Sequence, residues 1–271
     1  MSSTYITETW LREKFGLAEG TEVQLPTESL LTPSARELLE TRNIRIKYVD
    51  KAGRTFFEQE TAMGVPTRQQ VNPLTGKEGW QVGQCIVCHQ AVTKKPDTLT
   101  HLNERDLVAK NDARLKLRGK LDSAIAYAVW IQTEFEVSCH ALVLTHYLSD
   151  LRSALGNVLR AEVTGEAMPP VSMGKWDEQM LHAISHQPLK YLGHDHLLPE
   201  ASHGKQVARL NILRTMVREA ELCAADIYIA QDFSVIRPDI MAGLNRLSSA
   251  IYVMMLIVLL VERKQWKTDH D

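Results

Sequence analysis

The chain has 271 residues, with 31 Lys plus Arg against 33 Asp plus Glu, which leaves a net charge of −2. This balance excludes a general attraction for nucleic acid or for an anionic membrane, so any phosphate binding has to be local. Apolar residues make up 44% of the chain, which is enough for a sizeable core. The polar N-terminal stretch lacks an apolar signal core, and the most apolar run, residues 250–261, is shorter than the roughly 20 residues of a membrane span. We therefore expect a cytoplasmic protein in which this run forms the central buried helix of a bundle.

The pattern of residues 1–60 predicts a small α/β module. A helix over 7–15 is followed by a short strand at 22–25, and Thr32-Pro33 opens a second helix because proline suits the first helical position. Alternating residues over 44–58, interrupted by a turn, predict a β-hairpin. We interpret the module as an accessory or docking unit.

Residues 61–97 are rich in Gly, Pro, Gln and Thr and are predicted to be a linker that ends in a Cys-x-x-Cys-His segment. From residue 98 to 271 the pattern is mainly helical, with helices expected near 113–136, 140–163, 176–187, 203–231 and 238–263. Asp112, Ser202 and Pro238 are the expected helix-start signals. The predicted fold class is mainly α, a five-helix antiparallel bundle with a small N-terminal α/β module.

One helix face carries an unusual set of charges. Arg214, Arg218 and Glu221 stand at i, i+4 and i+7 and so share one face, and Asn245, Ser248 and Tyr252 have a similar spacing on the next helix. One interpretation is a row of salt bridges on a solvated face. The other is an anion site in which paired guanidinium groups bind phosphate oxygens.

Cys85, Cys88 and His89 form the second feature. The C-x-x-C spacing is that of half a metal knuckle and favours Zn²⁺ or Fe²⁺. The same letters spell a c-type haem attachment motif, which the missing export signal argues against. Four histidines cluster around the segment 187–202: His186, His194, His196 and His203. Three interpretations of them remain open: a second metal site, hydrogen-bonded loop residues, or contacts to a ligand. Four cysteines in a cytoplasmic chain argue against a disulfide framework.

Several stretches, in order along most of the chain, resemble the cobalamin adenosyltransferases, and most closely their ethanolamine-utilisation branch, the EutT family. They are LTPSARELLETRNIRIKYVD (31–50), KKPDTLTHL (94–102), AKNDARLKLRGKLDSAIA (109–126), SHQPLKYLGHDHLLPEASHG (185–204), LRTMVREAE (213–221) and LNRLSSAIYVMM (244–255). The wider group includes the PduO-type enzymes. The resemblance implies a homo-oligomeric helical bundle, trimeric in that group, with active sites between subunits.

The resemblance also implies the reaction: transfer of the 5′-deoxyadenosyl group of ATP, bound with Mg²⁺, to Co(I) of cobalamin. The residues it implies for ATP are Thr98, Thr100, Lys110, Arg114, Arg214, Arg218 and Asn245, of which Arg214, Arg218 and Asn245 are the catalytic candidates, with Asp122 and Glu221 expected to orient arginines. A corrinoid without its lower ligand needs an apolar wall, and the candidates for that pocket are Tyr191, Leu192, His194, His196, Leu197 and Leu198. The expected partners are ATP and the corrinoid, with ethanolamine ammonia-lyase, microcompartment components and a flavin reductant as further candidates.

The chain departs from the family pattern at the cysteines. Related sequences carry an upstream histidine and two adjacent cysteines, whereas Gln84 precedes Cys85 here and no histidine precedes His89. The alternative function is therefore a non-catalytic corrinoid- and metal-binding carrier or regulatory module. The phosphate-binding residues argue against it, because a carrier has no need for them.

Overall fold

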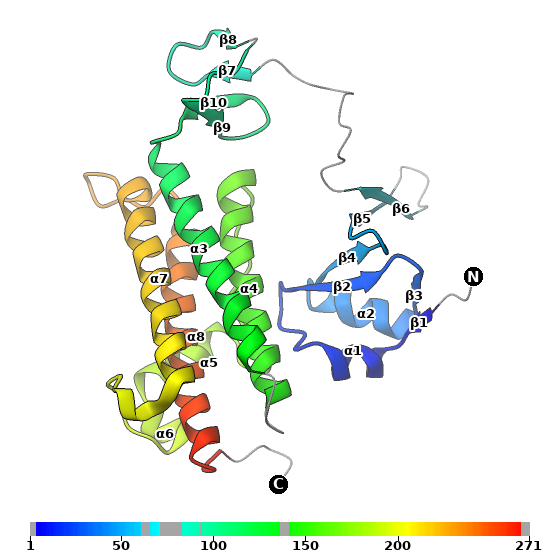
Figure 1. The fold of residues 1–271 in the computed structure, drawn as a ribbon, viewed down its shortest axis with the longest axis vertical. Coiled ribbons are helices and arrows are strands. Elements are labelled where there is room, and N and C mark those ends of the chain that lie inside the picture. Colours follow the sequence, from blue (N-terminus) through cyan, green and yellow to red (C-terminus); the bar gives the residue numbers. More distant parts are fainter. Residues whose placement is uncertain (1–3, 61–65, 71–82, 93, 136–140, 267–271) are drawn as a thin grey trace. The chain divides into compact units, whose positions relative to one another are not determined.

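The computed structural model describes residues 4–60, 66–70, 83–92, 94–135 and 141–266. The chain divides into two compact units, Met1–Val82 and Gly83–Asp271. Within the described residues the chain is mainly helical, with small sheets (Figure 1). Each unit is built around its own buried apolar cluster.

The first unit contains the predicted elements and three more strands. Its elements are β1 (Thr4–Ile6), α1 (Glu8–Lys14), β2 (Glu22–Pro26), β3 (Ser29–Leu31), α2 (Pro33–Thr41), β4 (Arg45–Val49), β5 (Thr55–Glu60) and β6 (Pro66–Gln70). The hairpin of β4 and β5 is confirmed, and β2 pairs parallel to β4. Sequence patterns did not indicate β1, β3 or β6, and β6 lies in the predicted linker. Strands of three to five residues give too few alternating positions to be recognised.

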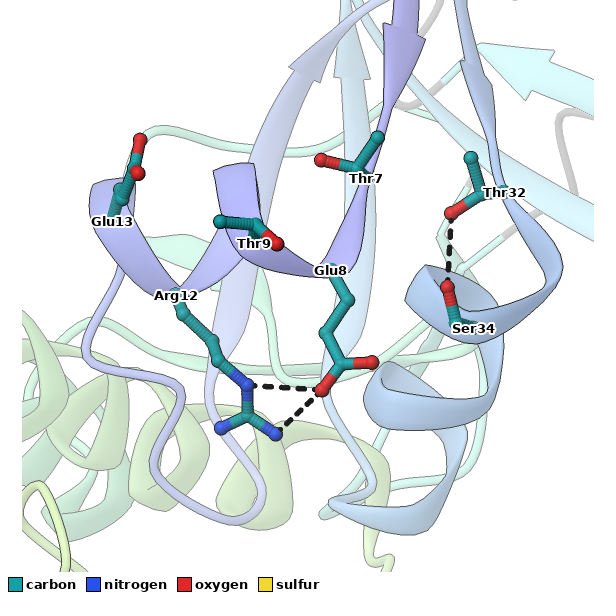
Figure 2. Close-up of a pocket in the computed structure, with 7 residues that line it drawn as sticks. All are labelled: Thr7, Glu8, Thr9, Arg12, Glu13, Thr32 and Ser34. Atoms are coloured by element: carbon teal, nitrogen blue, oxygen red, sulfur yellow. Dashed lines mark hydrogen bonds and ion pairs between the residues drawn. The ribbon is translucent and has the colours of Figure 1, made fainter.

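Threonines begin both helices of this unit, and a shallow pocket lies between the two helix starts (Figure 2). Thr7 caps α1 and Thr32 caps α2, each accepting a backbone N–H of the first turn. The Glu8 carboxylate binds Arg12, and the Thr32 hydroxyl contacts Ser34. Thr9 and Glu13 complete the lining. The contacts show that most of these polar groups stabilise the helix ends.

The second unit begins with a small sheet in the order β8-β7-β10-β9. Its strands are β7 (Gly83–Cys85), β8 (Ala91–Val92), β9 (Leu99–His101) and β10 (Asp106–Ala109). Strands β7 and β8 fall inside the segment 61–97 that was predicted to be a linker. The sheet precedes the helices directly and lies beyond the N-terminal end of α3 (Figure 1).

The helices that follow are α3 (Ala113–Glu134), α4 (Ala141–Thr164), α5 (Glu178–His186), α6 (Pro188–Leu192), α7 (Gly204–Tyr228) and α8 (Pro238–Glu262), with a short 3-10 turn at Ala201–His203. The five predicted helices are thus present as α3, α4, α5, α7 and α8, and their ends agree within a few residues, although α5 has only nine residues. The segment predicted as a loop, 187–202, contains α6. Asp112 and Pro238 are the helix-start residues that were expected. The predicted cap Ser202 is wrong, because His203 precedes α7 and the Ser202 hydroxyl contacts Glu200.

The four long helices α3, α4, α8 and α7 pack as neighbours that run in opposite directions (Figure 1). Side-chain contacts fix this arrangement: Lys120 of α3 binds Glu219 of α7, and Glu134 at the end of α3 binds Arg209 near the start of α7. Helix α5 packs on α8. Nearly all of α8 from Ala250 to Leu260 is buried, as expected of the central helix. Among the described residues, α8 is also long and apolar enough to cross a membrane by those two measures, which a buried core helix can equally satisfy.

A buried carboxylate joins the small sheet to the bundle. Glu162 of α4 is 0% exposed and accepts hydrogen bonds from Arg114 and Arg118 of α3. Arg118 also donates to the backbone oxygen of Leu102, which follows β9. One carboxylate thereby holds two helices and the sheet together, and its burial is compensated by two guanidinium groups.

Candidate functional site

The arginine pair predicted from sequence lies on one face of α7. Arg214 is half-buried and donates from Nε and Nη2 to Asn211 Oδ1 at 3.2 and 3.0 Å. Arg218 is exposed and makes no hydrogen bond or ion pair within the part of the chain that the structure describes. Burial, followed by the charge of Arg218, lowers the pKa of Arg214. The two cations therefore repel each other without a carboxylate between them, and a bound anion would relieve that repulsion.

The neighbouring polar residues join α7 to α8. Glu221 accepts a hydrogen bond from Asn245 Nδ2 at 3.2 Å and contacts neither arginine among the described residues. Asp122 is exposed on α3 and forms no contact with an arginine in the described chain. Neither acid therefore orients an arginine within the described chain, and the role expected for them stays a prediction. The salt-bridge row that was the alternative interpretation is likewise absent from this face in the described residues.

Tyr252 connects this face to the segment that follows α6. Its hydroxyl oxygen accepts the backbone N–H of Leu197 at 2.7 Å, and its ring stacks with His196 at 6.4 Å between centroids. Arg214 and Tyr252 lie within the range of an electrostatic interaction with each other. Arg263 Nη1 lies 3.4 Å from His194 Nε2 and can donate to it. Sequence spacing put Tyr252 on the face of Asn245 but gave it no role, because its partners come from a distant segment.

The predicted phosphate-binding residues of the small sheet lie apart from the arginine face. The carbonyl of Thr98 accepts the N–H of Lys110, and Thr100 pairs with Val108 in the sheet. The Lys110 side chain is exposed. Arg114 is bound to the side chain and the backbone oxygen of Glu162, which gives it a structural role, and its predicted contact with ATP stays a prediction. No interaction among the described residues joins Lys110 to Arg214 or Arg218.

The residues expected to form an apolar wall separate into two groups. Tyr191 and Leu192 of α6 line a pocket of about 410 Å³. Leu197 is buried and fixed by Tyr252, whereas Leu198 is 78% exposed. His194 and His196 contact α8 through Arg263 and Tyr252, as described above. These histidines are therefore hydrogen-bonded loop residues in this chain, and they form no metal-binding cluster within the described residues.

The cysteine segment forms a tight turn at the end of β7. The backbone N–H groups of Cys88 and Val87 and the Cys88 thiol lower the pKa of Cys85. The N–H of His89 donates to the Cys85 carbonyl, and its own backbone has a φ of 56°. No group of three or more potential ligands occurs in the described chain, so His89 does not join the two thiols. Two thiols are half of a tetrahedral zinc site, so the described residues do not fit a complete one.

Comparison with known proteins finds matching families for both units of the chain. Residues 5–72 match the family model of the corrinoid adenosyltransferase EutT N-terminal domain, and residues 91–258 match the cobalamin adenosyltransferase model. The corrinoid adenosyltransferases EutT of Escherichia coli K12 and of Salmonella typhimurium are each 50% identical over 253 residues, which cover 93% of this chain and 91% of theirs.

Solved structures of lower similarity include two variants of a PduO-type ATP:corrinoid adenosyltransferase from Lactobacillus reuteri, both in complex with cobalamin and ATP. The identities are 15% and 16%, with TM-scores of 0.49 and 0.48, over 61% of this chain and 88% and 91% of those chains. The family models and the 50% identical relatives decide the assignment: this chain belongs to the cobalamin adenosyltransferase family, in its EutT branch of corrinoid adenosyltransferases.

Proposed function

We propose that this chain transfers the 5′-deoxyadenosyl group of ATP to the cobalt of a reduced corrinoid. The electron pair of Co(I) forms a bond to the 5′ carbon, the bond from that carbon to the phosphate oxygen breaks, and triphosphate leaves with its electron pair. The corrinoid is the nucleophile, so the protein has to supply positioning and charge compensation. The observation that carries the proposal is the arginine pair on α7, in which exposed Arg218 places a second positive charge beside Arg214 and has no anionic partner in the described chain.

We assign the leaving group to these two arginines. Negative charge develops on the triphosphate as the carbon–oxygen bond breaks, and guanidinium groups form two parallel hydrogen bonds to phosphate oxygens. Arg214 is held by Asn211, and Arg218 is free to approach the ligand. Asn245, oriented by Glu221, is a candidate to hold the nucleoside part of ATP. Mg²⁺ brought in with ATP would compensate part of the triphosphate charge beside these residues.

Lys110, Thr98 and Thr100 are further candidates for the phosphates. Thr100 lies in β9, Thr98 directly precedes that strand and Lys110 directly follows β10, so all three lie beyond the N-terminal end of α3 and away from the middle of α7 (Figure 1). We propose that the sheet of one copy completes the arginine face of another, so that the active enzyme is a homo-oligomer with sites between subunits. The separation of the two sets of residues within one chain supports this arrangement.

The corrinoid is proposed to bind beside the segment 193–198, which Tyr252 fixes close to the arginine face. In the cytoplasm, a flavin is a candidate source of electrons for Co(I), and ethanolamine ammonia-lyase is a candidate consumer of adenosylcobalamin. The first unit, with its own core, is a candidate docking module for such partners or for a microcompartment.

The test is the anaerobic conversion of chemically reduced cob(I)alamin with ATP and Mg²⁺, followed by absorbance. We expect ATP-dependent conversion to adenosylcobalamin by the full-length protein. Corrinoid binding without conversion would instead support the carrier function, and absence of both would contradict the proposal.

Transition-metal dependence is a separate prediction. Since Cys85 and Cys88 are joined by no third ligand in the described chain, we expect conversion to survive a chelator once Mg²⁺ is resupplied. The double variant Cys85→Ser, Cys88→Ser is expected to retain activity as well. Activity lost with the chelator and restored by Zn²⁺ or Fe²⁺ would contradict this and show that the turn forms a working metal site in the assembled enzyme.

A further inference from the structure

The pocket formed by α5, α6 and the turn before α5 has no role in the mechanism above. Its volume is about 410 Å³, and its apolar lining consists of Trp176, Met180, Ile184, Tyr191 and Leu192. Lys175 and Asp177 are the charged residues of its lining. Small-molecule pockets are typically apolar and aromatic with a few polar groups, which is the composition found here. We refer to this cavity as the Trp176 pocket.

The position of Trp176 is fixed by the turn that contains it. Backbone hydrogen bonds of 2.9 and 3.1 Å close the turn between Met173 and Trp176. Inside the turn, Gly174 has a φ of 57°, and its N–H donates to the buried carboxylate of Asp150 at 2.8 Å. A Cβ on Gly174 would lie 2.4 Å from the Tyr147 ring, so the turn packs directly on Tyr147. This support fixes the indole before any ligand arrives.

The rest of the indole's surroundings are also aromatic. The Trp176 ring lies 5.6 Å from Tyr147 and 6.3 Å from Trp266, between centroids. Tyr191, which also lines the pocket, is 39% exposed, and the Lys190 ammonium lies 5.0 Å from the centre of its ring. The pocket therefore offers aromatic faces with a cation at its edge, which suits a flat heterocycle attached to a phosphate.

The proposed substrate carries such a group. Cobalamin has a nucleotide tail in which a phosphate and a ribose lead to a benzimidazole base, and that base can coordinate the cobalt from below. An axial ligand changes the redox potential of the metal, and Co(II) is hard to reduce while the base is bound. The base must therefore leave the cobalt. Burying the released aromatic ring in an apolar pocket lowers its free energy relative to water.

The Trp176 pocket lies next to the proposed corrinoid position along the chain. Leu192 lines the pocket, and Leu197, five residues later, is hydrogen-bonded to Tyr252. Five residues span at most about 18 Å, so the pocket and the Tyr252 contact lie within the reach of one corrinoid with its tail.

We propose that the Trp176 pocket binds the benzimidazole base of the nucleotide tail after it has left the cobalt, with Lys190 near the tail phosphate. This inference rests on the proposed function and adds a subsite that distinguishes complete cobalamin from corrinoids without a tail.

The test compares two corrinoids: cob(I)alamin, and cob(I)inamide, which lacks the nucleotide tail. In Trp176→Leu we expect the KM for cob(I)alamin to rise roughly 5- to 100-fold, the range for loss of one stacked ring, while the KM for cob(I)inamide stays unchanged. Tyr191→Ala changes a second lining side chain, which is 39% exposed, and is expected to act in the same direction. Trp130→Leu, at a 44% exposed tryptophan of α3, is the matched control and should leave both constants unchanged.

The outcomes separate this inference from the proposed function. If the wild-type protein converts neither corrinoid, the proposed function is wrong. If it converts both and the Trp176 and Tyr191 variants affect both corrinoids equally, or neither, the tail subsite is wrong while the enzymatic function stands. A rise confined to cob(I)alamin in both variants supports the subsite, and circular dichroism of each variant establishes that the bundle is folded.

Discussion

Replacing Arg218 by alanine is expected to lower kcat for adenosyl transfer by about 10²- to 10³-fold, as loss of one donor to a developing anion does in other enzymes. The physical reason is that Arg218 has no partner in the described chain, so its charge is available to the triphosphate as the carbon–oxygen bond breaks. Because the side chain is exposed and unpaired there, its removal leaves no buried group unsatisfied. The free energy of unfolding should change by no more than about 0.5 kcal/mol, the usual range for surface substitutions.

Two further variants make this measurement specific. Arg218→Lys keeps the charge but loses the planar fork, and should recover only part of the rate. Arg160→Ala removes a guanidinium from an exposed ion pair with Glu166 at the end of α4 and should leave kcat unchanged. Wild-type kcat in Arg218→Ala would show that the arginine face does not bind the leaving group.

Replacing Glu162 by alanine is expected to lower the free energy of unfolding by about 3–5 kcal/mol, the cost of breaking a buried ion pair by removing one partner. The carboxylate is fully buried between Arg114 and Arg118, and both guanidinium groups would lose their only carboxylate in the described chain. The substitution would weaken the contact between α3 and α4 and, through Arg118, the contact of α3 with the small sheet. Urea unfolding followed by circular dichroism measures the change.

The matched control for this second variant is Glu166→Ala. Glu166 also pairs with an arginine, but both side chains are about half exposed, and such pairs contribute only about 0–1 kcal/mol. Glu162→Gln, which keeps the shape and some of the hydrogen bonds, should fall between the two. Equal stability of Glu162→Ala and Glu166→Ala would contradict a joining role for the buried carboxylate.

Local signals in the sequence were sufficient for much of the fold. The apolar spacing of 3.6 residues indicated the four long helices α3, α4, α7 and α8, because that period repeats over many turns in each of them. Thr32-Pro33, Asp112 and Pro238 marked helix starts, since capping depends on neighbouring residues only. Ser202 failed as a cap because a 3-10 turn ends at His203 just before α7. The small sheet was missed because its strands of two to four residues carry almost no periodicity.

For the candidate site, too, some features follow from the sequence and others only from the tertiary structure. Helical spacing alone determined that Arg214, Arg218 and Glu221 share a face, and residue order along the chain determined the family resemblance. Only the tertiary structure decided their partners: Glu221 binds Asn245, Arg114 binds buried Glu162, and Tyr252 binds Leu197. It also brought Trp176 and Tyr191 to one pocket from two separate elements. The physical reason is that a helix period sets which side chains point in one direction, whereas partners from distant segments are chosen by how the helices pack.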